Sequence, residues 1–225
     1  RPQRAAPQPA RAAVGVALVT VSRQYGAGGS EVARRFADAL GWTVVDNEFV
    51  SAVAAQAGLP TEAVAAHEER VPSLIVRLGR ALAVSSPEMF VPGAAAATEP
   101  EEETLVRVTE RVIQEAASHG RVVLVGRGAQ ALLAGAPGLD ALHVYVAAPR
   151  EARIRVVMER LGLGEADAAR TVDTTDADRD RYVQHHYGRR RDDPANYHLV
   201  VNTALLGYDG AADLVVAAAR RRGWT

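Results

Sequence analysis

Residues 21–33 read VSRQYGAGGSEVA and follow an apolar, β-branched run at residues 14–21. Apolar residues then recur with helical spacing over residues 30–40, and Gly41 ends the pattern. A buried strand, a glycine-rich turn and the start of a helix form the setting of a phosphate-binding loop, because backbone N–H groups and the helix dipole converge there on an anion. The sequence therefore predicts a phosphate cradle, with magnesium at its serine, made of Gly26, Ala27, Gly28, Gly29 and Ser30.

This loop departs from the common phosphate-loop motif G-x-x-x-x-G-K-[ST]. Gly28 and Ser30 fit the motif, but Gly29 stands where the lysine belongs and Arg23 where the first glycine belongs. The chain contains no lysine, so the 26 basic residues counted as Lys+Arg are all arginine. Any side-chain cation that contacts phosphate is therefore a guanidinium, whose planar fork suits bidentate contact. We expect Arg23 to replace part of the lysine's role.

Two other interpretations of the loop stay open. A dinucleotide-binding loop reads G-x-G-x-x-G; Glu31 occupies its third glycine position, although Asp46 lies near the distance of a ribose-binding carboxylate. A tight strand-to-helix turn without a ligand is the second interpretation. The density of glycine at residues 26–29 exceeds what one turn requires, and this favours phosphate binding.

Length and composition limit the classes of protein. The chain has 225 residues, of which 48% are hydrophobic and 24% charged, as in a globular domain with a substantial core. Its net charge of −1 gives no overall basic field for a nucleic acid or a membrane surface, and we expect neither partner. The absence of cysteine excludes disulfides and thiolate metal sites and fits the cytoplasm. No apolar run approaches the roughly 20 residues that cross a bilayer.

The first 13 residues differ from the rest of the chain. They are rich in Ala, Pro, Arg and Gln and lack the apolar core of a signal peptide. We interpret residues 1–13 as a flexible tail or linker, through which the chain could be fused to another domain, and residues 14–225 as one domain. A homo-oligomer stays open as well.

Beyond the loop, apolar runs alternate with helical patterns. This alternation predicts an α/β fold, in which helices cover both faces of a parallel sheet. Strands are expected at residues 43–46, 121–125, 142–146 and 198–202. Helices are expected at residues 47–57, 61–70, 73–84, 101–119 and 209–222, with one more beginning at Pro149. Because ligands of such sheets bind beyond the carboxyl ends of the strands, the candidate site lies at residues 22–30, 46–48, 126–128 and 147–153.

Arginines stand at several of these places. Arg127, between two glycines after a predicted strand, either clamps a second phosphate or is a solvated loop residue. Arg179 and Arg181 lie two residues apart on a predicted helix, where they point in different directions. They belong either to a mobile lid that closes over a transferring phosphoryl group, which Arg153 could join, or to a solvated helix of mixed charge. The adjacent residues His185 and His186 do not indicate a metal site.

Four motifs in this order resemble the cytidylate kinase-like family, a divergent branch of the nucleoside monophosphate kinases. They are VTVSRQYGAGGSEVA at residues 19–33, VGRG at 125–128, DADRDRY at 176–182 and PANYHLVVN at 194–202. The resemblance covers the chain from about Val16 to its end. It implies a P-loop kinase fold with a helical monophosphate-binding insertion and an arginine-bearing lid.

The resemblance also implies roles for single residues. Gly26 to Ser30 would hold the phosphates of ATP with Mg²⁺, Asp46 and Arg127 the acceptor monophosphate, and the lid arginines the transferring group. Gly128 departs from the Gly-Arg-Asp motif of cytidylate kinases, and this departure could change the acceptor. The expected activity is ATP-dependent phosphoryl transfer to a nucleoside monophosphate, CMP or dCMP by analogy. The alternatives are a kinase for another small molecule and a nucleotide-binding regulatory domain with little catalysis.

Overall fold

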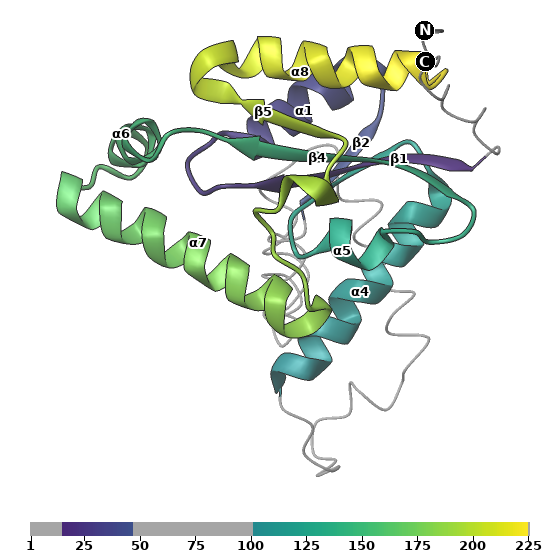
Figure 1. Cartoon of the computed structure of the whole chain (residues 1–225), viewed down its shortest axis with the longest axis horizontal. Coiled ribbons are helices and arrows are strands. Elements are labelled where there is room, and N and C mark those ends of the chain that lie inside the picture. Colours follow the sequence, from purple (N-terminus) through teal and green to yellow (C-terminus); the bar gives the residue numbers. More distant parts are fainter. Residues whose placement is uncertain (1–14, 47–100, 225) are drawn as a thin grey trace, which may run out of the picture.

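The computed structural model describes residues 15–46 and 101–224, and these contain a five-stranded sheet (Figure 1). All strand pairs are parallel, and the strand order is β2-β3-β1-β4-β5. The strands are β1 Val16–Arg23, β2 Thr43–Asp46, β3 Val122–Val125, β4 Leu139–Ala147 and β5 Leu199–Asn202. The predicted α/β architecture is confirmed. Because β1 lies in the middle of the sheet, the glycine-rich loop that follows it lies at the centre of the carboxyl edge.

Helices cover both faces of the sheet and extend past its carboxyl edge (Figure 1). Helices α1 (Gly29–Leu40) and α8 (Thr203–Arg221) cover one face. Helices α4 (Glu101–His119) and α5 (Ala129–Leu133) cover the other. Helices α6 (Arg150–Leu161) and α7 (Glu165–Tyr187) pack together beside the carboxyl ends of β1 and β4. The last two helices therefore form a wall next to the glycine-rich loop.

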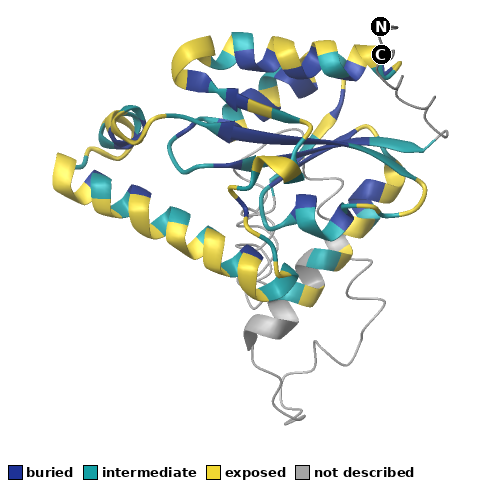
Figure 2. Ribbon diagram, viewed as in Figure 1, coloured by how far each residue is buried: buried dark blue, intermediate teal, exposed yellow. Residues whose placement is uncertain are grey.

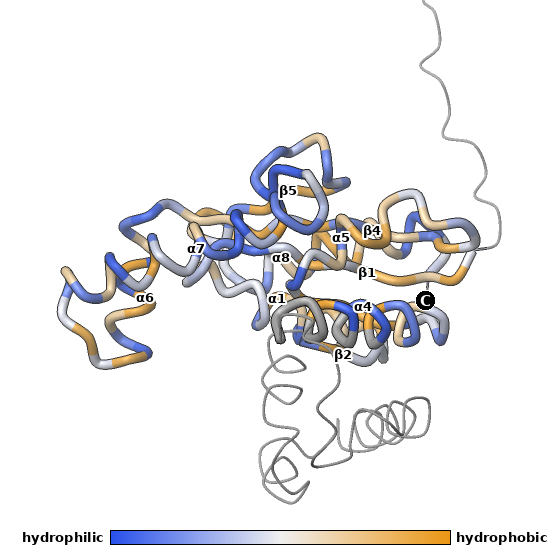
Figure 3. Tube along the Cα trace, turned by 90° about the horizontal axis from the view of Figure 1, so that it is seen from below, coloured by the Kyte–Doolittle hydropathy of each residue, from blue (hydrophilic) through white to orange (hydrophobic). Residues whose placement is uncertain are grey.

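The core consists of two apolar layers, one on each face of the sheet. On β1, Val19 and Val21 face α1 and α8, whereas Leu18 faces α4 and α5. Figure 2 shows the buried strands between the helical layers, and Figure 3 shows the hydrophobic character of β1 and β4. The strands are continuous apolar runs because both of their faces are covered.

Most predicted elements are present, with shifted ends. The helix at residues 101–119 is confirmed at both ends, β1 begins and ends two residues later than its predicted run, and β4 extends further than its predicted run at both ends. Helix α8 begins six residues earlier than predicted, because the Asn202 side chain accepts a hydrogen bond from the Ala204 N–H and caps it. The predicted pattern began only after Gly207, whose φ of 67° interrupts the helix.

Some expectations lie outside the described residues. These are the tail at residues 1–13, the helices at residues 47–57, 61–70 and 73–84, and with them the monophosphate-binding insertion. Within residues 15–46 and 101–224, no helix combines the length and the apolar character that a bilayer span requires.

Candidate active site

The glycine-rich loop joins β1 to α1 through two glycines with left-handed backbone angles. Gly26 and Gly28 have left-handed φ angles of 79° and 75°, which glycine adopts without the strain of other residues. Gly28 is the N-cap of α1 and provides no side-chain cap, so the first N–H groups of this 12-residue helix have no capping side chain. An anion at this position would bind these N–H groups and the positive end of the helix dipole.

Ser30, Asp46 and Arg23 form one chain of contacts beside the loop. The Ser30 hydroxyl donates to Asp46 Oδ2 at 3.0 Å, and Arg23 Nη2 lies 3.5 Å from Asp46 Oδ1. Asp46 ends β2, so the sheet brings it to the loop from two strands away. A hydroxyl next to a carboxylate suits a hard cation such as Mg²⁺. The described residues hold no group of three or more potential metal ligands, so such an ion would need phosphate and water oxygens as well.

Arg23 reaches from the end of β1 to the loop that follows β3. Its side chain is 6% exposed. A Cβ atom added at Gly126 would lie 1.8 Å from Arg23 Nη1, and one added at Gly29 would lie 2.5 Å from Arg23 Cβ. Glycine at both positions therefore makes room for this arginine, which is the cation that we expected beside the loop.

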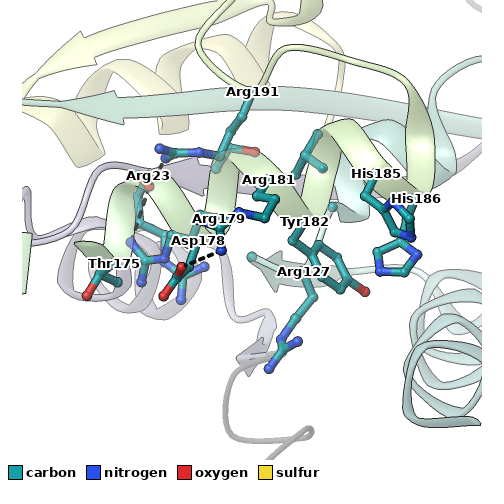
Figure 4. Close-up of a pocket in the computed structure, with 14 residues that line it drawn as sticks. Arg23, Arg127, Thr175, Asp178, Arg179, Arg181, Tyr182, His185, His186 and Arg191 are labelled. Carbon is teal, nitrogen blue, oxygen red and sulfur yellow. Dashed lines mark hydrogen bonds and ion pairs between the residues drawn. The ribbon is translucent and has the colours of Figure 1, made fainter. Parts of the chain in front are cut away.

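A cavity of about 630 Å³ lies between Arg23, the loop after β3 and helix α7 (Figure 4). Along α7, Thr175, Arg179, Tyr182 and His186 line it at helical spacing, so one stripe of the helix faces the cavity. Among the described residues that line the cavity, Asp178 is the only carboxylate. The described lining contains five arginines: Arg23, Arg127, Arg179, Arg181 and Arg191.

The two predicted lid arginines both line the cavity but differ in setting. Arg179 Nη1 donates to the Arg23 carbonyl at 3.4 Å, and its guanidinium lies 5.4 Å from the Tyr25 ring centroid. Arg181 is 74% exposed and pairs with Asp178 at 3.0 Å. Arg179 is therefore held near the glycine-rich loop, whereas Arg181 lies at the mouth of the cavity.

Arg127 lines the cavity from the loop that follows β3. Its φ of 48° is unusual for a residue with a side chain, and such strain is concentrated at functional sites. Its guanidinium lies 5.3 Å from the ring centroid of Tyr182. Within the part of the chain that the structure describes, Arg127 has no carboxylate partner. It is therefore placed to receive an anionic group of a ligand.

Arg153, expected at the substrate, lies elsewhere. It is 6% exposed, does not line the cavity and donates to the carbonyls of Ala148 and Tyr25 at 3.0 and 3.1 Å. Its Nη1 also lies 2.6 Å from Asp176 Oδ2. These contacts use the guanidinium fork inside the protein, which favours a supporting role over contact with a substrate.

Sequence reasoning missed two groups that shape the cavity. Arg191, buried at 7% exposure, donates to the Arg23 carbonyl and pairs with Asp180 at 2.7 Å. Burial alone would lower the pKa of Arg191, but nearby Tyr145 and Asp180 shift it upward, so it stays charged. In the sequence, nothing distinguishes this arginine from its neighbours Arg189 and Arg190.

The second group is the tyrosine pair of α7. A Cβ atom at Gly128 would lie 2.3 Å from the Tyr187 ring, so the glycine that replaces an aspartate here leaves room for this ring. The Tyr187 hydroxyl donates to Glu110 at 3.1 Å, and burial raises the pKa values of Tyr182 and Tyr187. Both hydroxyls therefore stay neutral beside Arg127.

Comparisons with known proteins agree with this fold. A model of the cytidylate kinase-like family matches residues 18–205. The chain resembles the solved structure of an uncharacterized protein from Eubacterium ventriosum, which is 17% identical with a TM-score of 0.64 and covers 90% of this chain and 97% of its own. Shikimate kinase from Bacteroides thetaiotaomicron is 10% identical with a TM-score of 0.51, over 91% of this chain and 99% of its own. At these identities the likeness is one of fold.

The chain is also similar in sequence to part of a protein that is not named as a kinase. The uronate isomerase of Corynebacterium glutamicum is 33% identical over 129 residues, which make up 57% of this chain and 24% of the relative. The chain therefore matches about a quarter of that protein's length.

Proposed function

This chain belongs to the cytidylate kinase-like family and has the fold of the P-loop kinases, and we propose that it transfers a phosphoryl group from ATP to a nucleoside monophosphate, CMP or dCMP. The observation that carries the proposal is the arginine-lined cavity, which Arg23 lines at the end of β1, just before the glycine-rich loop, and Arg127 lines after β3. A cavity that has Arg23 at one side and, at the other, an arginine without a carboxylate partner among the described residues suits two anionic substrates.

In this proposal the loop holds the donor. The N–H groups of residues 26–30 bind the phosphates of ATP, and Arg23 supplies the charge that the missing lysine would supply. Ser30 and Asp46 would hold Mg²⁺, which neutralises charge on the phosphates when it is bound. In this proposal Asp46 also serves the acceptor site, and it orients Ser30, whose hydroxyl donates to its carboxylate.

The remaining arginines act on the acceptor and on the transferring group. Arg127 binds the phosphate of the monophosphate, and its stacking on Tyr182 fixes its direction. Arg179 and Arg181 stabilise the charge that spreads over the transferring group, so catalysis consists of positioning and charge neutralisation. No covalent intermediate is needed. Nucleotides are the partners in this proposal; a cytoplasmic location, a homo-oligomer and a fused domain stay predictions.

A second candidate acceptor is a sugar acid. The relative named uronate isomerase matches this chain over a quarter of its length, and a uronate carries a carboxylate. A guanidinium such as that of Arg127 binds a carboxylate with the same bidentate geometry as a phosphate. The third possibility is a nucleotide-binding domain without turnover. Such a domain would bind ATP at the same donor site but would transfer no phosphoryl group to any acceptor.

An acceptor panel separates these functions. Release of ADP from ATP is measured with CMP, dCMP, the other nucleoside monophosphates, hexuronates and aldonates, in wild type and in Arg127→Ala. We expect transfer to CMP or dCMP, and a rise of the acceptor KM of about 10- to 100-fold in the variant, because a charged hydrogen bond of roughly 1.5–3 kcal/mol is lost. The KM for ATP should change little.

Each other outcome has a meaning. Transfer to sugar acids but not to monophosphates selects the second candidate. ATP binding without transfer to any acceptor selects the binding domain. Equal increases of both KM values in Arg127→Ala contradict the assignment of Arg127 to the acceptor.

A further inference from the structure

We propose that Asp176 is a positioning residue which, together with Arg153, clamps the backbone of Tyr25 and so fixes the glycine-rich loop in its phosphate-binding conformation. The inference rests on the proposed function, because it concerns the loop that holds the donor phosphates. We call these three residues the Tyr25 clamp.

The backbone contacts of the clamp form a closed set. The Tyr25 N–H donates to Asp176 Oδ1 at 2.9 Å, and the Tyr25 carbonyl accepts from Arg153 Nη1 at 3.1 Å. The same Nη1 lies 2.6 Å from Asp176 Oδ2. Both polar groups of one residue are thus held by an ion pair whose side chains are only 8% and 16% exposed.

The clamped residue directly precedes the first glycine of the loop. Gly26 has a φ of 79°, and a Cβ atom there would lie 2.8 Å from the Arg153 carbonyl, so the loop passes closely over α6. Rotation of the Tyr25 peptide groups would break both of their hydrogen bonds to this ion pair, which is costly because the Tyr25 N–H and carbonyl would lose these partners. The entry to the loop is therefore fixed before any phosphate binds.

The ring of Tyr25 also contacts Arg179, one of the two predicted lid arginines. It lies between two guanidinium groups, with Arg160 at 5.1 Å and Arg179 at 5.4 Å from its centroid. The Tyr25 hydroxyl accepts a hydrogen bond from Arg160 Nη2 at 2.6 Å. Because Arg179 also contacts the Arg23 carbonyl, the clamp sets the place of this arginine relative to the loop.

Charge balance explains why an acid is needed at position 176. Asp176 lies 2.6 Å from Arg153 and 3.3 Å from Arg191, and both arginines are buried. Without this carboxylate, two guanidinium groups would face each other beside the loop. The clamp therefore docks α7, the arginine-bearing helix, against the loop in the absence of a nucleotide.

Asp173 offers a matched control for the test. It lies one turn earlier on α7 and pairs with Arg150 of α6 at 2.6 Å, with side chains that are 54% and 46% exposed. Asp173→Asn removes an ion pair between the same two helices without touching the loop, whereas Asp176→Asn removes the clamp. Arg153→Lys is the companion variant, because it keeps the charge of the cluster and removes Nη1, the atom that contacts both the Tyr25 carbonyl and Asp176.

The experiment measures the loop and the enzyme separately. Amide hydrogen exchange over residues 23–30 is recorded without nucleotide, ATP affinity by calorimetry, and KM for each substrate by turnover. In Asp176→Asn and Arg153→Lys we expect exchange of these amides to accelerate about tenfold or more, since a local opening becomes easier. ATP affinity should fall about 10- to 100-fold, as expected when binding groups are misplaced by about 1 Å. The acceptor KM should stay within about twofold, and Asp173→Asn should match wild type in all three.

Other results overturn the proposal. If the folded Asp176→Asn and Arg153→Lys variants exchange residues 23–30 at the wild-type rate, the network has only a structural role. The same conclusion follows if Asp173→Asn disturbs the loop equally. If Asp176→Asn does not fold, Arg153→Lys decides alone. A wild type that binds no ATP removes the proposed function, whereas the exchange comparison still decides whether the clamp orders the loop.

Discussion

Arg23 is a buried cation beside the glycine-rich loop of a chain that contains no lysine. Its guanidinium contacts Asp46 and lies against the backbone at Gly126. A lysine would act as a flexible point charge, whereas this arginine is fixed between two loops by its planar fork. In the proposed function, Arg23 can therefore bind the donor phosphates, and it also lines the cavity that contains Arg127.

Replacing Arg23 by alanine should weaken ATP binding by about 10- to 100-fold, because one charged hydrogen bond of roughly 2 kcal/mol is lost. Arg34→Ala is the control, since Arg34 lies on α1, is 57% exposed and pairs with Glu31. Calorimetric titration with ATP measures both. Unchanged affinity in a folded Arg23→Ala variant would mean that Arg23 serves only as a partner for Asp46.

Helix α7 carries Arg179 and Arg181, the two arginines proposed to act in catalysis, and Arg179 lies on the stripe that also holds Thr175 and Tyr182. Its docking separates the two arginines, because Arg179 is stacked on Tyr25 whereas Arg181 is exposed at the mouth of the cavity. The mobile lid expected from the sequence thus corresponds to a helix that contacts the loop through Asp176. Whether it moves during turnover stays a prediction.

Replacing Arg179 or Arg181 by alanine should lower kcat and leave ATP affinity nearly intact, because arginines that stabilise a transferring phosphoryl group act mainly in the transition state. The loss can reach about 10³-fold, and we expect it to be larger for Arg179, which lies closer to the loop. Arg170→Ala, on the same helix and 76% exposed, is the control. Single-turnover transfer gives the rate. A fall in ATP affinity at unchanged kcat would contradict a catalytic role for either residue.

The elements show what the sequence can predict. Strand and helix patterns are local, so the sheet, α1 and the helix at residues 101–119 followed from periodicity and glycine punctuation. The site loops followed from the topology of parallel sheets. The sequence does not predict which arginines are buried. Burial of Arg153 and Arg191 depends on Asp176 and Asp180, whose positions are set by tertiary packing. The same limit applies to Gly28 and Gly128, which leave room for the rings of Tyr208 and Tyr187.

Across the whole molecule, the two ends of the sheet have different tasks. The cavity lies at the carboxyl ends of the strands, whereas residues 222 and 224 make their contacts near the opposite edge of the sheet. Trp224 packs on Trp42 with ring centroids 5.5 Å apart, and Arg222 pairs with Asp140 at 2.7 Å. His143 lies in the middle of β4, between these two ends of the sheet. Its side chain is 7% exposed, and its Nδ1 lies 2.8 Å from Thr20 Oγ1 of β1. This histidine is remote from the loops, so its protonation reports on the fold rather than on catalysis.

Acid should destabilise the protein through His143. Burial lowers the pKa of His143 to about 4, and the neighbouring His198 and Arg222 add to the shift. The neutral form is therefore favoured by folding, so this stability is fully present above the unfolded pKa of about 6.5 and is lost as the pH falls toward 4. The shift corresponds to up to about 3 kcal/mol.

Urea unfolding at pH 7 and pH 4.5 tests this in wild type and in His143→Gln. Carboxylates titrate in both proteins, so the difference between their pH dependences isolates the histidine. We expect wild type to lose about 2–3 kcal/mol more than the variant between the two pH values. His185→Gln, at an exposed position on α7, should behave as wild type because its ring is not buried in the sheet. Equal losses in wild type and His143→Gln would show that the buried imidazole tolerates its charge.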